Sequence, residues 1–318
     1  MSGARAIGLL LGYAADGLFG DPRRGHPVAA FGAAANKAEQ WLYRDHKVPG
    51  LLHSAVLSGG AVALGIAVER AGKHRPVLQM LSTAVATWVV LGGASLAEAG
   101  TAIGGELDAG DVAAARDRLP SLCGRDPHAL DQTGLARAAV ESVAENTSDA
   151  VVAPLFWGAI AGIPGLLGYR AVNTLDAMVG HRSPRYQQFG WAAARIDDVL
   201  NLAPARLAAL LATVGAPVVG GSAAAAWRTW RRDASAHPSP NAGQIEAAFA
   251  GALEIRLGGR TAYAHGFEDR PVLGDGRTPD SGHVTRAVEL SRVVGALAGA
   301  VAVVLAWLVG RRKAGHTG

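Results

Sequence analysis

Four windows of this 318-residue chain contain no charged residue and are long enough to cross a lipid bilayer. They are Val77–Ala97, Ala150–Tyr169, Leu207–Trp227 and Val293–Gly310, and a fifth window, Leu51–Val68, is interrupted only by His53. About 18 or more consecutive apolar residues are typical of a transmembrane helix. The alternative is a soluble, alanine-rich helical protein, but five such windows are hard to bury within one soluble chain. We therefore predict a membrane protein.

The composition agrees with this interpretation, because half of the residues are hydrophobic and only 18% are charged. Small residues dominate the apolar windows, and Gly158–Gly162 and Gly295–Gly299 are GxxxG patterns that favour close helix packing in lipid. Ala6–Ala15 is too short to span, although extended through Gly20 it could form a short or re-entrant segment. The predicted fold is an all-α polytopic integral membrane helical bundle of about five to six spans or re-entrant helices. It forms a single domain over residues 1–318.

Three polar excursions interrupt the apolar windows, at residues 16–50, 98–149 and 228–292. In the second, the spacing of apolar residues predicts helices over Asp111–Leu119 and Gln132–Ala144. The third is rich in glycine and proline after Pro238, which indicates a structured loop. Basic residues border several windows without a consistent pattern, so the positive-inside rule does not give the orientation.

The charge and cysteine content exclude some function classes. The net charge of +4 comes mainly from arginine, and no dense basic stripe with interleaved aromatic residues occurs, so we expect no nucleic-acid partner. The single cysteine, Cys123, cannot form an intramolecular disulfide. The chain contains no GxxxxGK[ST] phosphate loop, no zinc-type His/Cys spacing and no GxSxG motif.

An acidic cluster directly precedes the window Ala150–Tyr169. Glu141, Glu145 and Asp149 follow one another at intervals of four, which places them on one face of a regular helix. Like charges on one face repel and are costly to desolvate near a membrane. A divalent cation, a cationic ligand or neighbouring arginines must compensate them, so we predict a functional site here.

A second polar set follows the same window. Its members are Arg170, Asn173 and Asp176, then Arg195, Asp197, Asp198 and Asn201, and finally Arg206. Carboxylate and amide oxygens are the ligands that Mg²⁺ prefers, and arginines bind phosphate oxygens. Interfacial ion pairs that hold helices together are the alternative. Further on, Pro240-Asn241-Ala242-Gly243 predicts a sharp turn that starts a helix near Gln244 and presents the Asn241 amide to a ligand or to solvent.

These motifs, taken in order, resemble the CobD/CbiB family of integral membrane proteins of cobalamin biosynthesis. The resemblance rests on Asp16–Pro22 with His26-Pro27-Val28, Glu141–Asp149, Pro154–Trp157, Tyr169–Asp176, Arg195–Asn201 with Pro204-Ala205-Arg206, and Ser239–Gly243. It runs from Gly8 to about Gly274. It implies a ligase that uses ATP, with Mg²⁺, to join aminopropanol or its O-phosphate to the propionate carboxylate of adenosylcobyric acid. The product is adenosylcobinamide or its phosphate.

The resemblance also implies roles for the polar residues. Glu141, Glu145, Asp149 and Asp198 would be catalytic, and Glu145, Asp149, Asp176 and Asp197 would hold Mg²⁺. The residues expected to bind phosphate or substrate are Arg170, Asn173, Arg195, Asn201, Arg206, Asn241, Asp21 and His26, with the last three at the entrance. The expected location is the inner cell membrane, with several passes through the bilayer, and later membrane enzymes of the cobalamin pathway are possible partners.

Two other function classes fit part of the pattern. Intramembrane carboxylates beside arginines and helices interrupted by Gly or Pro also describe an ion-coupled transporter. No inverted repeat is visible in the sequence, which disfavours that reading. A non-catalytic membrane sensor with the same fold would retain the polar residues only as structural pairs.

Overall fold

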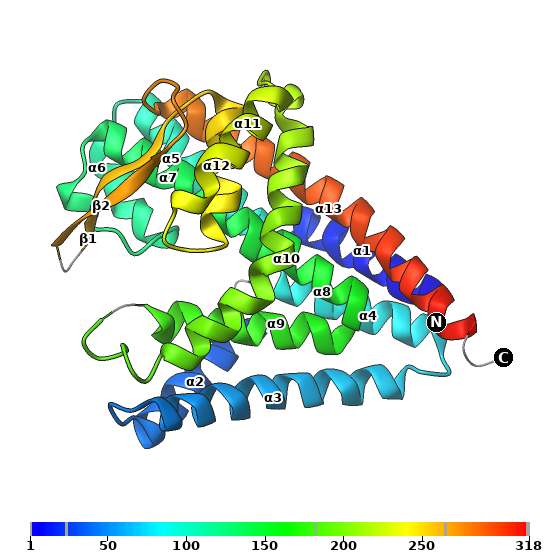
Figure 1. Ribbon diagram of the computed structural model, residues 1–318. Coiled ribbons are helices and arrows are strands. Elements are labelled where there is room, and N and C mark those ends of the chain that lie inside the picture. The colour runs from blue at the N-terminus through cyan, green and yellow to red at the C-terminus, as the bar shows by residue number, and fades with distance from the viewer. Residues whose placement is uncertain (1, 23–24, 182, 264–265, 316–318) are drawn as a thin grey trace. The chain divides into compact units, whose positions relative to one another are not determined.

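The computed structural model describes residues 2–22, 25–181, 183–263 and 266–315. Within these ranges the fold is helical apart from one antiparallel hairpin (Figure 1), which confirms the all-α class. The longer elements are α1 (Ser2–Phe19), α2 (Pro27–Leu42), α3 (Lys47–Ala71), α4 (Pro76–Val90), α5 (Gly93–Asp108), α6 (Val112–Arg118), α7 (Gln132–Thr147), α8 (Ala153–Ala161), α9 (Ile163–Leu175), α10 (Trp191–Gly215), α11 (Ala223–Asp233), α12 (Ala242–Leu253), β1 (Leu257–Tyr263), β2 (Gly266–Leu273) and α13 (Ser281–Gly315).

Four helical segments of the described chain are long and apolar enough to cross a membrane: Lys47–Ala71, Pro76–Asp108, Trp191–Val219 and Ser281–Arg311. These segments confirm the membrane character of the chain. Their number in the described residues is lower than the five to six spans or re-entrant helices predicted. The window Leu207–Trp227 ends at Val219, because Gly220 adopts a left-handed backbone (φ 74°) and a new helix begins at Ala223.

The prediction of one span over Ala150–Tyr169 is wrong, because the window divides into the consecutive helices α8 and α9. Gly162 adopts a left-handed backbone (φ 71°), and Pro164 lies in the first turn of α9, where its missing N–H costs nothing. The helix ends at this break are capped by an ion pair from other helices. Arg5 donates to the Ile160 carbonyl at 3.5 Å and pairs with Glu69, which accepts the Ile163 N–H at 3.1 Å. One open carbonyl and one open N–H at the break are therefore satisfied by side chains.

The described residues gather into two compact units, each built from separate stretches of the chain. Unit 1 contains the residues up to Gly92, Ala153–Asn201 and the residues from Ala298 onward. Unit 2 contains Gly93–Val152 and Leu202–Leu297. The helices α10 and α13 contribute residues to both units.

In unit 1, α1 packs on α4 and α3 packs on α9. Gly8 and Gly12 allow the closest approach, because a Cβ atom at either position would collide with Thr83 or Thr87 of α4. These glycines form a GxxxG pattern that the sequence analysis did not single out. Of the predicted patterns, Gly158 does lie in a tight contact, against Leu9 and Leu166.

The helix α10 contains Pro204, which has no N–H to donate to the carbonyl of Leu200 one turn earlier. The indole of Trp157 donates to that carbonyl at 3.1 Å instead. A tryptophan of α8 thus replaces the missing helical hydrogen bond, which makes a proline tolerable inside an apolar helix.

In unit 2, α7 packs on α5, α11 packs on α12, and the hairpin β1–β2 lies beside α7 and α12 (Figure 1). The second polar excursion is predicted well, because α6 and α7 begin within one residue of the expected starts. In the third excursion, α12 begins close to the helix start predicted near Gln244, but the hairpin β1–β2 lies where the sequence analysis expected a structured loop. The prediction of a loop is therefore wrong for this segment. Its glycines belong to a bulged strand, in which Gly258 (φ 80°) lies between the paired residues Leu257 and Gly259.

Candidate functional site

Two π-helical turns mark the predicted acidic positions. The first, Ser148–Val152, follows α7 and contains Asp149, and the second, Asp176–Gly180, begins at Asp176. A π-helical turn is rare and is often found at functional sites. Because the first turn interrupts the 3.6-residue period, the predicted common face of three carboxylates holds only for Glu141 and Glu145. Asp149 lies in the wider turn.

The predicted residue Glu141 is the centre of a buried cluster in unit 2. Its side chain is 1% exposed, and one carboxylate oxygen, Oε2, accepts from the guanidinium of Arg125. The other oxygen, Oε1, accepts the backbone N–H of Gly258 at 2.6 Å. That N–H is available because Gly258 is the bulged residue of β1. Both oxygens of this carboxylate are therefore occupied by donors.

Glu246 of α12 is a second buried carboxyl of the cluster, at 2% exposure. Burial is the largest cause that raises its pKa well above the usual carboxyl value, and the negative charges of Glu141 and Glu145 act in the same direction. The guanidiniums of Arg125 and Arg270 oppose this shift. Glu246 is thus favoured in its protonated form.

His237 faces Glu246, with its Nε2 atom 3.9 Å from the Oε2 atom of the carboxyl. Its other ring nitrogen, Nδ1, accepts the N–H of Ser239 at 3.1 Å, so the hydrogen of the neutral ring is assigned to Nε2. Burial lowers the pKa of His237, and the charge of Arg270 lowers it further. The ring is therefore neutral, and its Nε2 has no hydrogen-bond partner among the described residues.

Glu145 completes the cluster from α7, one turn beyond Glu141. Burial raises its pKa, while Arg270 and Arg125 lower it. Its side chain is nevertheless exposed by surface area, unlike Glu141 and Glu246. Since direct access to water stabilises the charged form, we expect the pKa shift of Glu145 to be the smaller one. Glu145 is the carboxylate of this cluster that a ligand can reach.

The charges of the cluster balance if one proton is bound. Three carboxyl groups (Glu141, Glu145, Glu246) interact with two guanidiniums (Arg125, Arg270). A proton on Glu246 brings the formal sum to zero, as the low dielectric of a protein interior requires. The sequence analysis expected a divalent cation, a cationic ligand or neighbouring arginines to compensate the acidic face. In the structure, two arginines from other elements lie close enough to do so.

Sequence reasoning missed Glu246, His237, Arg125 and Arg270. Glu246 gives a usable signal, because it is a lone acidic residue in the apolar stretch Ile245–Leu253. A carboxyl in such a stretch is costly to bury and indicates a special role. Arg125 and Arg270 lie in polar segments and give no such signal. Only the packing of α7, α12 and the hairpin brings them together.

The predicted residues of the second set form a separate hydrogen-bonded chain in unit 1. Tyr169 donates to the Oδ1 atom of Asn201 at 2.9 Å, and the Asn201 amide donates to Asp197 at 2.9 Å. Asn173 reaches the other oxygen of Asp197 at 3.4 Å. Asp197, Asn201 and Tyr169 are all buried. The structure therefore brings the predicted residues Asn173, Asp197 and Asn201 into contact. Tyr169 is a further member of this hydrogen-bonded chain.

The other predicted residues lie outside these two groups of contacts. Arg195 and Asp198 form a partly exposed pair at 3.2 Å, and Arg206 donates to the Leu202 carbonyl of its own helix at 2.7 Å. His26 caps α2 by accepting the Val28 N–H at 3.1 Å, and its Nε2 atom lies 3.8 Å from Asp21. Arg170 is half-buried on α9, and Asp176 is half-buried at the start of the second π-helical turn.

Asn241 lies at the start of α12, which begins at Ala242, two residues before the predicted start. The hydroxyl of Ser239 accepts the N–H groups of Asn241 at 3.3 Å and Ala242 at 3.1 Å. This turn holds His237 beside α12. Gly243 permits the contact, because a Cβ atom there would collide with the Cβ of His237.

The sequence comparisons agree with the predicted resemblance. The family model described as CobD/Cbib protein matches residues 9–291. The chain belongs to the CobD/CbiB family. A relative from Mycobacterium tuberculosis, named cobalamin biosynthesis protein CobD, is 58% identical over 304 residues, which is 95% of this chain and 96% of the relative. Proteins of the same name from Rhodobacter capsulatus (42% identity; 95% and 94% covered) and Geobacter metallireducens (44%; 83% and 85%) are also similar. No solved structure matches the chain.

The expected Mg²⁺ ligands of this CobD/CbiB protein belong to both units, with Glu145 and Asp149 in unit 2 and Asp176 and Asp197 in unit 1. Among the described residues, no group of three or more His, Cys, Asp or Glu side chains could hold a metal ion. Both oxygens of Glu141 and both of Asp197 already accept hydrogen bonds. The assignment of these four residues as Mg²⁺ ligands stays a prediction. Magnesium that enters bound to a nucleotide needs only one or two such carboxylates.

Proposed function

We propose that this protein acts in cobalamin biosynthesis as an adenosylcobinamide-phosphate synthase. It would join the amine of aminopropanol, or of its O-phosphate, to the propionate carboxylate of adenosylcobyric acid, with ATP as co-substrate. Family membership and the names of the relatives support the pathway. The structural observation that carries the chemistry is the reachable carboxylate of Glu145 beside a buried, charge-balanced cluster.

The reaction needs two steps, since a carboxylate is a poor electrophile. The propionate first attacks the γ-phosphate of ATP, which gives an acyl phosphate and ADP. The amine then attacks the acyl carbon, the C–N bond forms, and the C–O bond to phosphate breaks. Positive groups must neutralise the oxygens in the first step. Arg270, half-buried on β2, is suited to this role.

The second step requires a base, because the amine reaches the site as an ammonium ion. A general base is most effective when its pKa is close to the working pH. We assign this role to Glu145, whose pKa is raised and whose side chain a ligand can reach. Glu246 and His237 would hold the adjacent interior neutral, so that the ammonium ion is attracted to Glu145 alone.

The test is a conversion assay on the detergent-purified chain with ATP, adenosylcobyric acid and either amine, read by mass spectrometry. The expected product is heavier by the amide-linked aminopropanol or its phosphate. Glu145→Gln should lower the turnover by about 100-fold or more, which is typical for loss of a general base. Glu39→Gln is the matched control, since Glu39 is a buried carboxylate of unit 1 paired with Arg185. No product from folded protein with either amine would overturn the proposal.

One observation favours a transport function as a second candidate. The break at Gly162 divides an apolar window into two helices, and discontinuous helices form substrate sites in ion-coupled transporters. A transporter would move a corrinoid across liposomes without covalent change. Uptake by proteoliposomes without ATP consumption would support this function over the synthase.

A further inference from the structure

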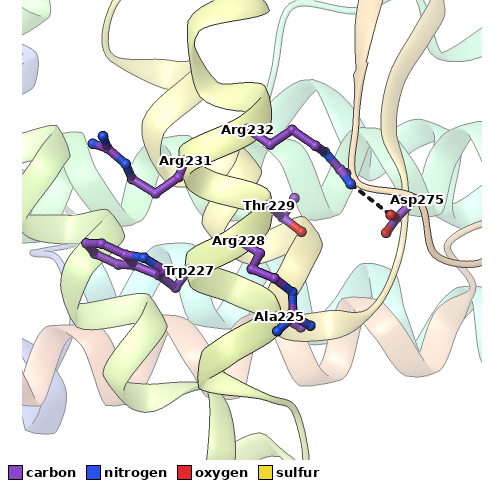
Figure 2. Close-up of a pocket in the computed structure, with 7 residues that line it drawn as sticks. All are labelled: Ala225, Trp227, Arg228, Thr229, Arg231, Arg232 and Asp275. Atoms are coloured by element: carbon purple, nitrogen blue, oxygen red, sulfur yellow. Dashed lines mark hydrogen bonds and ion pairs between the residues drawn. The ribbon is translucent and has the colours of Figure 1, made fainter.

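A cleft of about 510 Å³ lies along α11 in unit 2 and contains none of the residues discussed above as a candidate site. Its lining consists of Ala225, Trp227, Arg228, Thr229, Arg231, Arg232 and Asp275 (Figure 2). Three of these seven residues are arginines, and all three are exposed. The lining is therefore suited to an anion that is bound on one side and stays partly exposed at the surface of the protein.

The three arginines differ in how far their charge is already compensated. Arg232 pairs with Asp233 at 2.6 Å and with Asp275 at 2.9 Å, and Asp233 is held in turn by the Gly274 N–H at 2.8 Å. Among the described residues, no carboxylate pairs with Arg228 or Arg231. Arg232 thus forms a fixed wall of the cleft, while Arg228 and Arg231 carry the charge available to a ligand.

The cleft combines these charges with an exposed aromatic side chain. Trp227 is 46% exposed, and the guanidinium of Arg231 lies 6.0 Å from the centre of its ring. Figure 2 shows Trp227 and Arg231 projecting from one side of α11, whereas Arg232 reaches across to Asp275. The buried side of the helix carries Trp230, whose indole donates to Gln244 at 2.9 Å. The Trp227 ring lies edge-on against that of Trp230, with ring centres 5.2 Å apart, and the rest of the Trp227 indole stays exposed.

The position of α11 in the chain places this surface close to a membrane boundary. The candidate span Trp191–Val219 ends four residues before Ala223, the first residue of α11. Four residues reach at most about 14 Å, which is within the headgroup region at the end of a span. Tryptophan and arginine are the side chains typical of this depth, because both combine an apolar body with a polar end.

We propose that this cleft binds the phosphate of an anionic phospholipid headgroup, with Arg228 and Arg231 as donors and Trp227 at the level of the upper acyl chain. A soluble ligand of the size of a nucleotide is usually buried over most of its surface. The exposure of all three arginines disfavours that occupant, whereas a lipid needs only its headgroup held. The proposal is independent of the synthase activity.

Native mass spectrometry of the full chain in detergent tests the proposal, with phosphatidylglycerol and phosphatidylcholine added in parallel. We expect phosphatidylglycerol to be retained in preference to phosphatidylcholine. Arg228→Gln combined with Arg231→Gln should weaken that retention by about 30-fold, from the usual contribution of two basic residues near an anionic surface. The matched control combines Arg256→Gln with Arg277→Gln, two exposed arginines elsewhere in unit 2. The control protein should retain the lipid as the wild type does.

Two further arms separate the lipid from a soluble phosphate. Inorganic phosphate and aminopropanol phosphate, each added in excess, should leave the retained phosphatidylglycerol in place. Displacement by either compound would assign the cleft to a soluble phosphate and overturn the lipid proposal. Equal retention of both lipids, or equal retention by the wild type and the Arg228/Arg231 variant, would overturn it as well. A thermal unfolding curve for each variant confirms that the compared proteins are folded.

Discussion

The backbone N–H of Gly258 donates to Glu141 at 2.6 Å from a position where β1 is bulged. A regular strand would use that N–H in the ladder with β2. The bulge instead directs it at a buried carboxylate, which also receives the guanidinium of Arg125. The hairpin and α7 are thus joined by a hydrogen bond to a charged group, a stronger contact than one between neutral groups.

Replacement of Glu141 by Gln should strongly destabilise the protein. The amide still accepts the Gly258 N–H, but the buried Arg125 guanidinium loses the carboxylate with which it forms its ion pair. Removing one member of a buried ion pair costs about 3–5 kcal/mol. Thermal unfolding in detergent measures the loss. Glu106→Gln serves as the control, because Glu106 pairs with Arg118, whose side chain is 45% exposed, and should cost at most about 1 kcal/mol. Equal losses for the two variants would contradict a special role for the buried pair.

Glu246→Gln should make stability less dependent on pH. The raised pKa means that the folded state keeps a proton that the unfolded state loses above about pH 4.3. The free energy of unfolding of the wild type therefore falls as pH rises from that value toward the folded pKa. Glutamine resembles the protonated carboxyl and cannot ionise.

Unfolding temperatures of the two proteins should accordingly be close near pH 4.5 and diverge by pH 8, where Glu246→Gln is the more stable. Each kcal/mol of difference corresponds to about 2–4 °C for a domain of this size. A wild-type protein that gains stability between pH 5 and 8 relative to the variant would show that Glu246 is charged in the folded state.

Gly258→Ala should disturb the cluster from the backbone side. The residue has φ 80°, which side chains rarely adopt, and an added Cβ would collide with the Pro271 carbonyl. Backbone strain of this kind costs about 1–3 kcal/mol. We expect a lower unfolding temperature together with a loss of synthase activity, measured on the same preparation. Gly105→Ala is the control, because a Cβ at that position meets no atom within 4 Å.

Asp197→Asn should test the polar chain in unit 1. The substitution keeps the size of the side chain but gives one end a donor, which then faces the amide of Asn201 or of Asn173. A buried hydrogen bond to a charged group contributes about 1.5–3 kcal/mol. If the chain is also part of the substrate site, kcat/KM should fall by more than the loss of folded protein explains. Unchanged kcat/KM in the folded fraction would limit Asp197 to a structural role.

Local signals explain which elements were predicted correctly. The starts of α6 and α7 were predicted from the local spacing of apolar residues. In the structure Asp111 and Asp131 cap these helices, accepting N–H groups at 3.0 Å and 2.7 Å within three residues. The apolar windows gave the membrane character for the same reason, since hydropathy is a property of the segment itself. The division of the window at Gly162 depended on one glycine and a nearby proline, and window averages do not register such a break.

The clusters were only partly predictable, because their members come from distant segments. The spacing of Glu141 and Glu145, and that of Asp197 and Asn201, follows from one helical turn and was visible in the sequence. The arrival of Glu246 beside them depends on the packing of α12 against α7. No residue spacing along the chain encodes that contact. The hairpin was missed because its strands carry several charges and β1 contains a bulge, which both obscure the alternating pattern of a strand.

The capped break at Gly162 has a consequence for the order of synthesis. Arg5 and Glu69, which satisfy the helix ends at Ile160 and Ile163, both precede that break in the chain. When α8 and α9 emerge from the ribosome, α1 and α3 with their capping residues have already been made. The hydrogen bonds to the backbone between α8 and α9 can therefore form as soon as these two helices are inserted. They do not depend on a segment that is still to be translated.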